Sequence, residues 1–104
     1  MNIVGRFEVE NLLVSTILAD DSNVYETGIA SSYYNDDHIV IVETYQNFSE
    51  ALKGHNSWVK VMNVPFEKLP QKLIASHSTF LSMLAELAGC QTEFYKTLPI
   101  EELL

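Results

Sequence analysis

Residues 38–59 read HIVIVETYQNFSEALKGHNSWV, and this stretch decides the fold. Its first nine residues are β-branched or aromatic almost throughout, which is typical of a β-strand. A helix then begins after Asn47, because an asparagine three residues before Glu50 forms a capping box. The helix is predicted to run to about Met62, with Pro65 closing the segment that follows. A strand leading directly into a capped helix predicts a protein that contains both element types.

Two further strands are predicted before this stretch, at residues 7–19 and 24–34. Both segments are rich in β-branched and aromatic residues, and polar turn clusters follow them at 20–23 and 35–37. Gly28 inside the second strand predicts a bulge or a close approach. Because parallel pairing would need a crossover of about a dozen residues, the short turns predict an antiparallel meander over residues 7–46.

A second, longer helix is predicted over about residues 70–89. Pro70 suits its first turn and Gly89 suits its C-cap. Positions 73, 77, 80, 84 and 87 form one helical stripe in which His77 is the polar member. The pattern therefore predicts one α+β domain over 1–104, with a three-stranded antiparallel meander packed against one short and one long helix.

The composition limits the classes of protein to which this chain can belong. The chain has 104 residues, of which 47% are hydrophobic, and this is enough for one core. No apolar run approaches the roughly 18–20 residues of a membrane span, and acidic residues near the start argue against a signal peptide. The single cysteine, Cys90, excludes an intramolecular disulfide. We expect a soluble cytoplasmic protein that does not bind membranes.

Charge narrows the range of partners. Fourteen acidic and six basic residues give a formal net charge of −8. A phosphate backbone is bound by clustered Lys and Arg, so we expect no direct binding to nucleic acid. The acids fit a well-solvated surface, a basic protein partner, or mimicry of nucleic acid.

The dipeptide Gly54-His55 is the most unusual feature of the first helix. A helical wheel places His55 on the apolar stripe with Ala51, Trp58 and Met62. Gly54 costs about 1 kcal/mol of helix propensity relative to alanine, which predicts the close approach of a strand. His55 is then either a core histidine bonded to a strand carbonyl or hydroxyl, or a base or ligand that faces a pocket.

Three short motifs carry a resemblance to a known group. YET at 25–27, ETY at 43–45 and the A..GH..WV pattern at 51–59 together resemble a family of small, mostly uncharacterised accessory proteins of tailed bacteriophages. The resemblance covers about residues 24–61, and Gly28-Ile29-Ala30 departs from the bulkier run of many relatives. It implies a phage accessory protein of the host cytoplasm and assigns no chemistry.

Candidate binding residues follow from the same segment. If the hairpin register places Glu26 and Glu43 on one face, they bind a polar or cationic group; otherwise they are ordinary strand residues. The candidates for a pocket between sheet and helix are Tyr25, Glu26, Glu43, Tyr45, His55 and Trp58. The candidates for a subunit interface on the long helix are Leu73, His77, Phe80, Leu84 and Leu87.

Other chemistry has little support in the sequence. His38, His55, His77 and Cys90 show no metal-ligand spacing, and the four glycines form no phosphate loop. A nucleophile–base pair would need Cys90 with a histidine, or Ser31 or Ser32 with His55, and no nucleophile motif surrounds them. We expect no metal, no cofactor and no catalysis.

The sequence therefore favours an acidic interaction protein. We expect a small phage-type accessory protein that binds and inhibits a host defence or transcription protein stoichiometrically, and that forms a homodimer or higher oligomer. One alternative is a protein that binds or sequesters a nucleotide-like signal. Another is a minor virion-associated protein.

Overall fold

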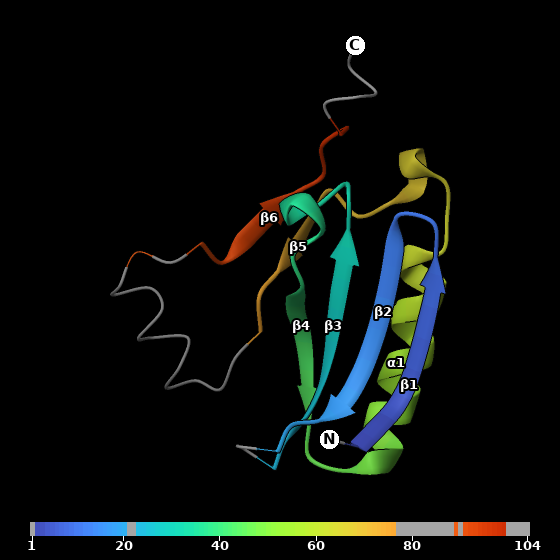
Figure 1. Ribbon diagram of the computed structural model, residues 1–104, viewed down its shortest axis with the longest axis vertical. Helices are drawn as coiled ribbons and strands as arrows, with labels where there is room; N and C mark the ends of the chain where they lie inside the picture. The colour runs from blue at the N-terminus through green and yellow to red at the C-terminus, as the bar shows by residue number, and fades with distance from the viewer. Residues whose placement is uncertain (1, 21–22, 77–88, 90, 100–104) are drawn as a thin grey trace.

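The computed structural model describes residues 2–20, 23–76, 89 and 91–99. Four strands form one antiparallel sheet in chain order, and a helix packs across one of its faces (Figure 1). A separate two-stranded sheet follows the helix. The elements are β1 (Asn2–Val9), β2 (Leu12–Leu18), β3 (Tyr25–Ser31), η1 (Asn35–Asp37), β4 (Val40–Tyr45), α1 (Phe48–Met62), η2 (Phe66–Lys68), β5 (Lys72–Ile74) and β6 (Glu93–Tyr95).

The α+β class is confirmed, but the meander has four strands where three were predicted. The single strand expected at 7–19 is a hairpin of β1 and β2, and β1 begins already at Asn2. Asn11 turns the chain with a φ of 66°, a left-handed conformation that asparagine tolerates better than most residues. Val9 therefore pairs with Leu12 across a two-residue loop.

Gly28 lies at the irregularity that the sequence predicted. The register between β3 and β4 shifts at this point, since Thr27 pairs with Glu43 while Gly28 pairs with Ile41. A Cβ at Gly28 would come within 2.6–2.7 Å of side-chain atoms of Ile39. The missing side chain thus lets an isoleucine lie over the strand, next to the bulge.

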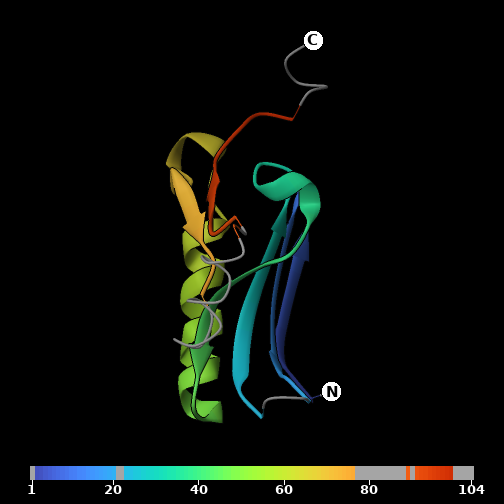
Figure 2. The ribbon, with the colours of Figure 1, turned by 90° about the vertical axis from the view of Figure 1, so that its left-hand side faces the viewer.

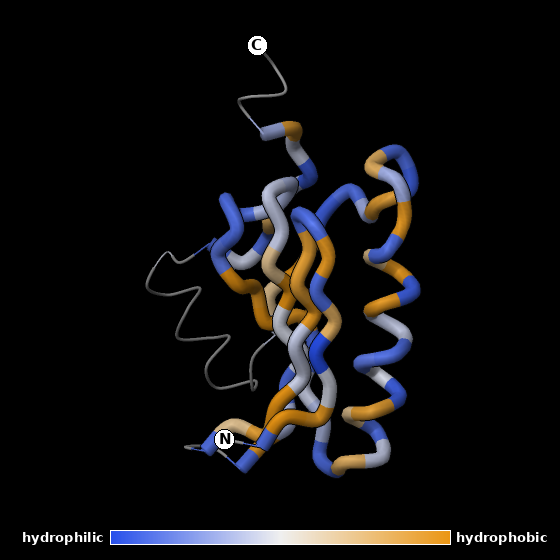
Figure 3. The backbone as a smooth tube through the Cα atoms, turned by 45° about the vertical axis from the view of Figure 1, so that its right-hand side comes forward, coloured by the Kyte–Doolittle hydropathy of each residue, from blue (hydrophilic) through white to orange (hydrophobic). Residues whose placement is uncertain are grey.

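Helix α1 confirms the predicted short helix. The side chain of Asn47 accepts a hydrogen bond of 2.9 Å from the backbone N–H of Glu50 and so caps the first turn. Ala51, His55 and Met62 are buried on one stripe. Figure 3 shows hydrophilic and hydrophobic residues alternating along the helix, as one buried and one solvated face require.

The long helix predicted from Pro70 is wrong at its start. Residues 72–74 form β5, which pairs with β6, and the hydroxyl of Tyr34 donates to the carbonyl of Pro70. Leu73 is 2% exposed and belongs to the core of its own chain. The rest of the predicted helix, 77–88, lies outside the described residues. Gly89 has a φ of +74°, a conformation that suits a glycine at a turn.

The core lies on the α1 side of the sheet. Figure 2 shows α1 and β5 on the same side of β1–β3. Apolar residues fill the half of this layer near the end of α1; the buried members are Leu12, Val14, Ile29, Tyr34, Val40, Val42, Met62, Leu69 and Leu73. No helix among the described residues has the length and apolar character needed to span a membrane.

Candidate functional site

The other half of the layer between α1 and the sheet is polar. Thr16 on β2 and Thr27 on β3 face each other directly in the register, and both are fully buried. Their hydroxyl oxygens lie 2.6 Å apart, and Nδ1 of His55 on α1 lies 2.8 Å from that of Thr16. Each strand contributes one hydroxyl at this level because alternate residues point toward the helix.

The hydrogen bonds continue from this group to the surface. The oxygen of Thr27 lies 3.0 Å from the Tyr45 hydroxyl, which donates to Oε1 of Glu43 at 2.7 Å. The indole Nε1 of Trp58 donates to the same carboxylate oxygen at 3.0 Å. We call these six side chains the polar chain: His55, Thr16, Thr27, Tyr45, Glu43 and Trp58.

The carboxylate at the end of the polar chain sets the direction of every bond in it. A carboxylate only accepts, so Tyr45 uses its one proton on Glu43 and must accept from Thr27. Thr27 must in turn accept from Thr16, and Thr16 must accept from Nδ1 of His55. The neutral imidazole therefore carries its proton on Nδ1.

Two glycines make room for this arrangement. A Cβ on Gly5 would lie 2.6 Å from Cδ2 and Nε2 of His55, so the imidazole packs directly against the β1 backbone. A Cβ on Gly54 would overlap the phenol ring of Tyr45. Gly54 thus admits a strand side chain, where the sequence predicted a strand backbone. Both glycines act through close approach, since neither has a positive φ.

Burial also fixes the charge states of the polar chain. Burial lowers the pKa of His55 below its ordinary 6.5, so the ring is neutral at pH 7. Burial is also the largest cause that raises the pKa of Tyr45 well above its ordinary value, and the nearby Glu43 adds to this shift. The His55 and Tyr45 side chains are thus uncharged at neutral pH, and the polar chain ends on the exposed Glu43.

The structure brings four of the six predicted pocket residues into the polar chain. Tyr25 lies beside them, opposite Tyr45 in the register, with its ring edge against Phe48 at a centroid distance of 6.4 Å. Glu26 does not join them: it pairs with Thr44 and points to the opposite face from Glu43. The shared-face pair of carboxylates is therefore absent.

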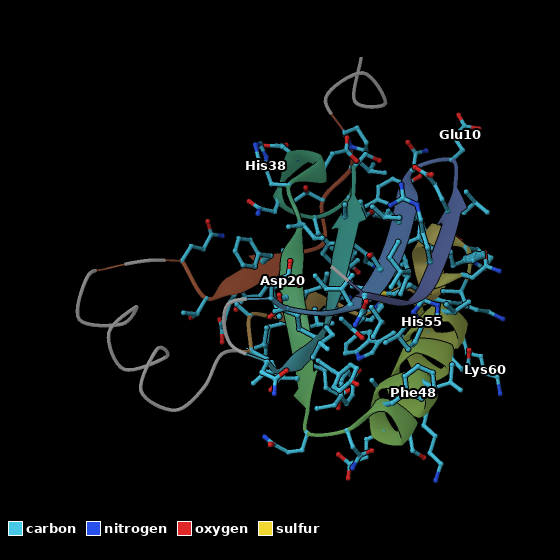
Figure 4. All side chains as sticks on the ribbon, turned by 60° about the horizontal axis from the view of Figure 1, so that its bottom comes forward. Glu10, Asp20, His38, Phe48, His55 and Lys60 are labelled. Atoms are coloured by element: carbon cyan, nitrogen blue, oxygen red, sulfur yellow. The ribbon has the colours of Figure 1, made fainter. Side chains whose placement is uncertain are left out.

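The His55 imidazole is enclosed between α1 and the sheet, with its Nε2 against Gly5 of β1. His55 is 6% exposed, its Nδ1 proton is engaged, and Figure 4 shows it on the side of α1 that faces the sheet. Ser31 lies four residues beyond Thr27 on β3, about 13 Å at 3.3 Å per residue, and Ser31 accepts from the Tyr33 N–H. No cluster of three metal-ligating side chains occurs within the described part of the chain.

Thr16, Thr27 and Gly5 were missed from the sequence. A signal for the threonines was present: in LLVSTIL the polar Thr16 stands at a position where the alternation with Leu12 and Val14 predicts a core residue. A buried hydroxyl needs a partner, so it predicts a polar contact across the layer. No sequence signal shows that this contact is His55, which comes from a distant segment.

Two hollows lie elsewhere on the described residues. The first, which we call the end cavity, has a volume of about 210 Å³ between the β1–β2 turn and the end of α1; Leu12, Tyr33, Met62, Asn63 and Phe66 are among its lining residues. The second, the acidic hollow, has a volume of about 340 Å³; it is lined by Glu8, Val9, Asn11, Leu12, Leu13, Ala30 and Asp37.

Comparison with models of protein families, with curated proteins and with solved structures found no match to this chain. The interpretation of its function therefore depends on its own geometry.

Proposed function

We propose that this chain is a phage-type accessory protein that binds a host protein stoichiometrically through the sheet face opposite α1. The observation that carries the proposal is the presence of exposed large aliphatic side chains on this open face. Ile3 is 65% exposed and Ile39 is 53% exposed, although both are large aliphatic residues. Exposed large aliphatic side chains that share one face of a sheet are candidates for an interaction site.

The register places further apolar residues on the open face. On β2, Leu13 and Ile17 alternate with the buried Val14 and Thr16, and so point away from α1. Ala30 lies opposite Leu13 on β3. Helix α1 and β5 lie on the other side of the sheet (Figure 2), while Asp37 of η1 borders the open face.

The acidic hollow indicates the chemistry of the partner. Its lining combines the carboxylates of Glu8 and Asp37 with the apolar side chains of Leu13 and Ala30. A lysine or arginine side chain matches this combination, because its aliphatic stem packs on apolar surface while its head binds carboxylates. The net charge of −8 also favours encounter with a basic partner. The partner surface is therefore apolar with at least one basic side chain.

The contrast with the polar chain supports binding over catalysis. The six side chains of the polar chain hydrogen-bond one another inside the joint between α1 and the sheet. The exposed apolar residues and the acidic hollow lie on the outer face. A host defence or transcription protein inhibited by occlusion fits a surface of this kind.

The test compares variants of the open face with matched controls. We expect immobilised protein to retain one saturable partner from a lysate of the bacterial host, with one-to-one stoichiometry in calorimetry. Ile39→Asp and Asp37→Lys should abolish or strongly weaken retention. Val61→Asp and Glu67→Lys make the same changes at exposed positions outside this face and should bind as the unmodified protein does. Equal binding by all four variants, or no saturable partner, would contradict the proposal.

The end cavity supports a second candidate, the binding of a small molecule. Leu12, Met62 and Leu69 form an apolar floor, while Tyr33 and Phe66 stand edge to face at 5.0 Å beside it. Its lining includes Glu10 and no Lys or Arg, so it favours an uncharged aromatic ligand over a nucleotide. Titration with free nucleobases and with nucleotides distinguishes an uncharged ligand from a charged one. The NMR signal of the Met62 methyl group should shift when a nucleobase is added and should not shift when a nucleotide is added. No shift with either class would remove this candidate.

A further inference from the structure

We infer that the free edge of β1 pairs with β1 of a second copy in antiparallel fashion, which joins the two four-stranded sheets into one continuous sheet. The inference goes beyond the proposed function, since it concerns an edge of the sheet where the host-binding surface is a face.

Strand β1 stands at the end of the strand order and pairs with β2 alone. It has eight residues, and along this strand Asn2, Ile3, Arg6, Glu8 and Val9 are exposed. Among the described elements none pairs with its outer side, which Figure 1 shows at the border of the sheet. An unpaired strand of this length presents a row of backbone donors and acceptors to another strand.

Some of the features that prevent such pairing are missing from this edge, although Arg6 and Glu8 give it charge. It contains no proline and no lysine, and its one irregularity lies between Ile3 and Gly5. From Gly5 to Val9 the strand is regular in its pairing with β2. This regular part is long enough for a partner strand to add a ladder of hydrogen bonds.

The charges of β1 are complementary to themselves in one antiparallel register. When Phe7 faces Phe7 of the second copy, Arg6 faces Glu8 of the second copy, and Glu8 faces its Arg6. Opposite charges across antiparallel strands stabilise the pair, and like charges destabilise it. Arg6 and Glu8 are 54% and 62% exposed and now bond each other at 3.3 Å, so they can exchange partners at little cost.

The flank of α1 nearest β1 carries apolar residues that such a dimer would bury. Gly54 and Trp58 contact Tyr45 and Glu43 on β4, so the opposite flank of the buried stripe faces β1. Leu52, 39% exposed, and the half-buried Val59 stand on that flank, seven residues apart. Because the two-fold axis is perpendicular to the sheet, both helices lie on one face and these flanks approach each other.

The experiment is a charge swap on the full chain, read out as mass in solution. Sedimentation equilibrium should give twice the chain mass of 11.8 kDa for the unmodified protein. Arg6→Glu alone and Glu8→Arg alone each place like charges opposite each other twice, and should raise the dimer dissociation constant about tenfold. The double variant Arg6→Glu/Glu8→Arg should return it to the original value.

Two results would overturn the inference. One is a monomer at 100 μM, a concentration chosen as roughly the upper range for a specific dimer; the other is a dimer that none of the charge changes affects. Circular dichroism checks that the variants are folded, which is expected because both side chains are exposed. As a measurement independent of any variant, amide exchange of β1 groups that do not bond β2 should slow as protein concentration rises. These readouts need no host protein, so they fail or succeed separately from the proposed function.

Discussion

Four small residues decide how α1 meets the sheet. Gly5 and Gly54 leave the space that the His55 imidazole and the Tyr45 phenol occupy, and Thr16 and Thr27 supply the hydroxyls that join them. Larger or apolar residues at these four positions would leave either a steric overlap or a buried polar group without a partner. The dipeptide Gly54-His55 is thus explained by packing and hydrogen bonding inside the joint.

Replacement of Thr16 by valine tests the polar chain at its centre. The side chain keeps its shape, but His55 Nδ1 loses its acceptor and Thr27 loses its donor, both in a buried position. We expect the free energy of unfolding to fall by about 1–3 kcal/mol in urea denaturation. Thr44→Val is the matched control, since Thr44 points to the opposite face, and it should stay within about 0.5 kcal/mol. Equal effects of the two variants would contradict the role of Thr16.

Replacement of Gly54 by alanine should destabilise the protein, against the trend for helices. Alanine is the better helix former by about 1 kcal/mol, but its methyl group would overlap the Tyr45 ring. Overpacking of this kind costs about 1–3 kcal/mol. Asn56→Ala, at an exposed position of the same helix, should be neutral or stabilising. A Gly54→Ala variant that melts higher than the unmodified protein would show that the joint is looser than the structure indicates.

The lowered pKa of His55 predicts a loss of stability in mild acid. Below pH 6.5 the unfolded chain binds a proton at this residue before the native state does, so the free energy of unfolding falls as pH decreases toward the native pKa. Above pH 6.5 this contribution is complete. Urea denaturation at pH 7.0 and 5.5 should show a larger loss for the unmodified protein than for His55→Gln, whose side chain does not titrate. Equal losses would exclude a buried neutral imidazole.

Elements with a strong local sequence signal, such as a cap or a clear periodicity, were predicted well. Elements without such a signal were not predicted. Asn47 and the stripe through His55 predicted α1 to within a residue of its ends. The β1–β2 turn was missed because Glu10 and Asn11 are only two polar residues between Val9 and Leu12 and contain no glycine or proline. A signal existed in the spacing: Phe7 and Val9 are out of phase with Leu12 and Val14, and a two-residue hairpin produces this change. Residues 72–74 form a strand because they pair with β6, although their sequence pattern predicts a helix.

The β1–β2 turn provides a test at the level of this element. Asn11 has a φ of 66°, which alanine adopts at a cost of about 1–2 kcal/mol and glycine adopts freely. Asn11→Ala should therefore lower the free energy of unfolding by about 1 kcal/mol, while Asn11→Gly should retain most of it. Chemical denaturation of the three proteins measures the difference. The same stability for both variants would indicate another turn conformation.

Across the whole molecule, the sequence predicted about half of the contacts that make up the layer between the sheet and the helix. The inward direction of His55 and the meeting of Glu43, Tyr45 and Trp58 follow from one continuous segment with clear periodicity. The contributions of Gly5 and Thr16 depend on which strand lies under α1, and on a register that local patterns do not determine. The polar chain occupies the part of the layer where the sequence predicted a pocket, and the end cavity lies at the other end of the layer.

The molecule has an inner joint between α1 and the sheet, which is closed, and outer surfaces that are available for binding. The inner joint holds the polar chain, in which each described proton donor has an acceptor. The outer surfaces are the open sheet face, to which we assign the binding of a basic partner, and the β1 edge, to which we assign self-association. The claim on which the description of the joint depends is that His55 is held there through Nδ1.

The tautomer of His55 tests this central claim most directly. Long-range proton–nitrogen correlation spectra of ¹⁵N-labelled protein at pH 7 distinguish a protonated from an unprotonated ring nitrogen. The account predicts one neutral form with the proton on Nδ1, held there by the run of hydrogen bonds that ends on Glu43. A proton on Nε2, or a rapidly exchanging imidazolium, would contradict it.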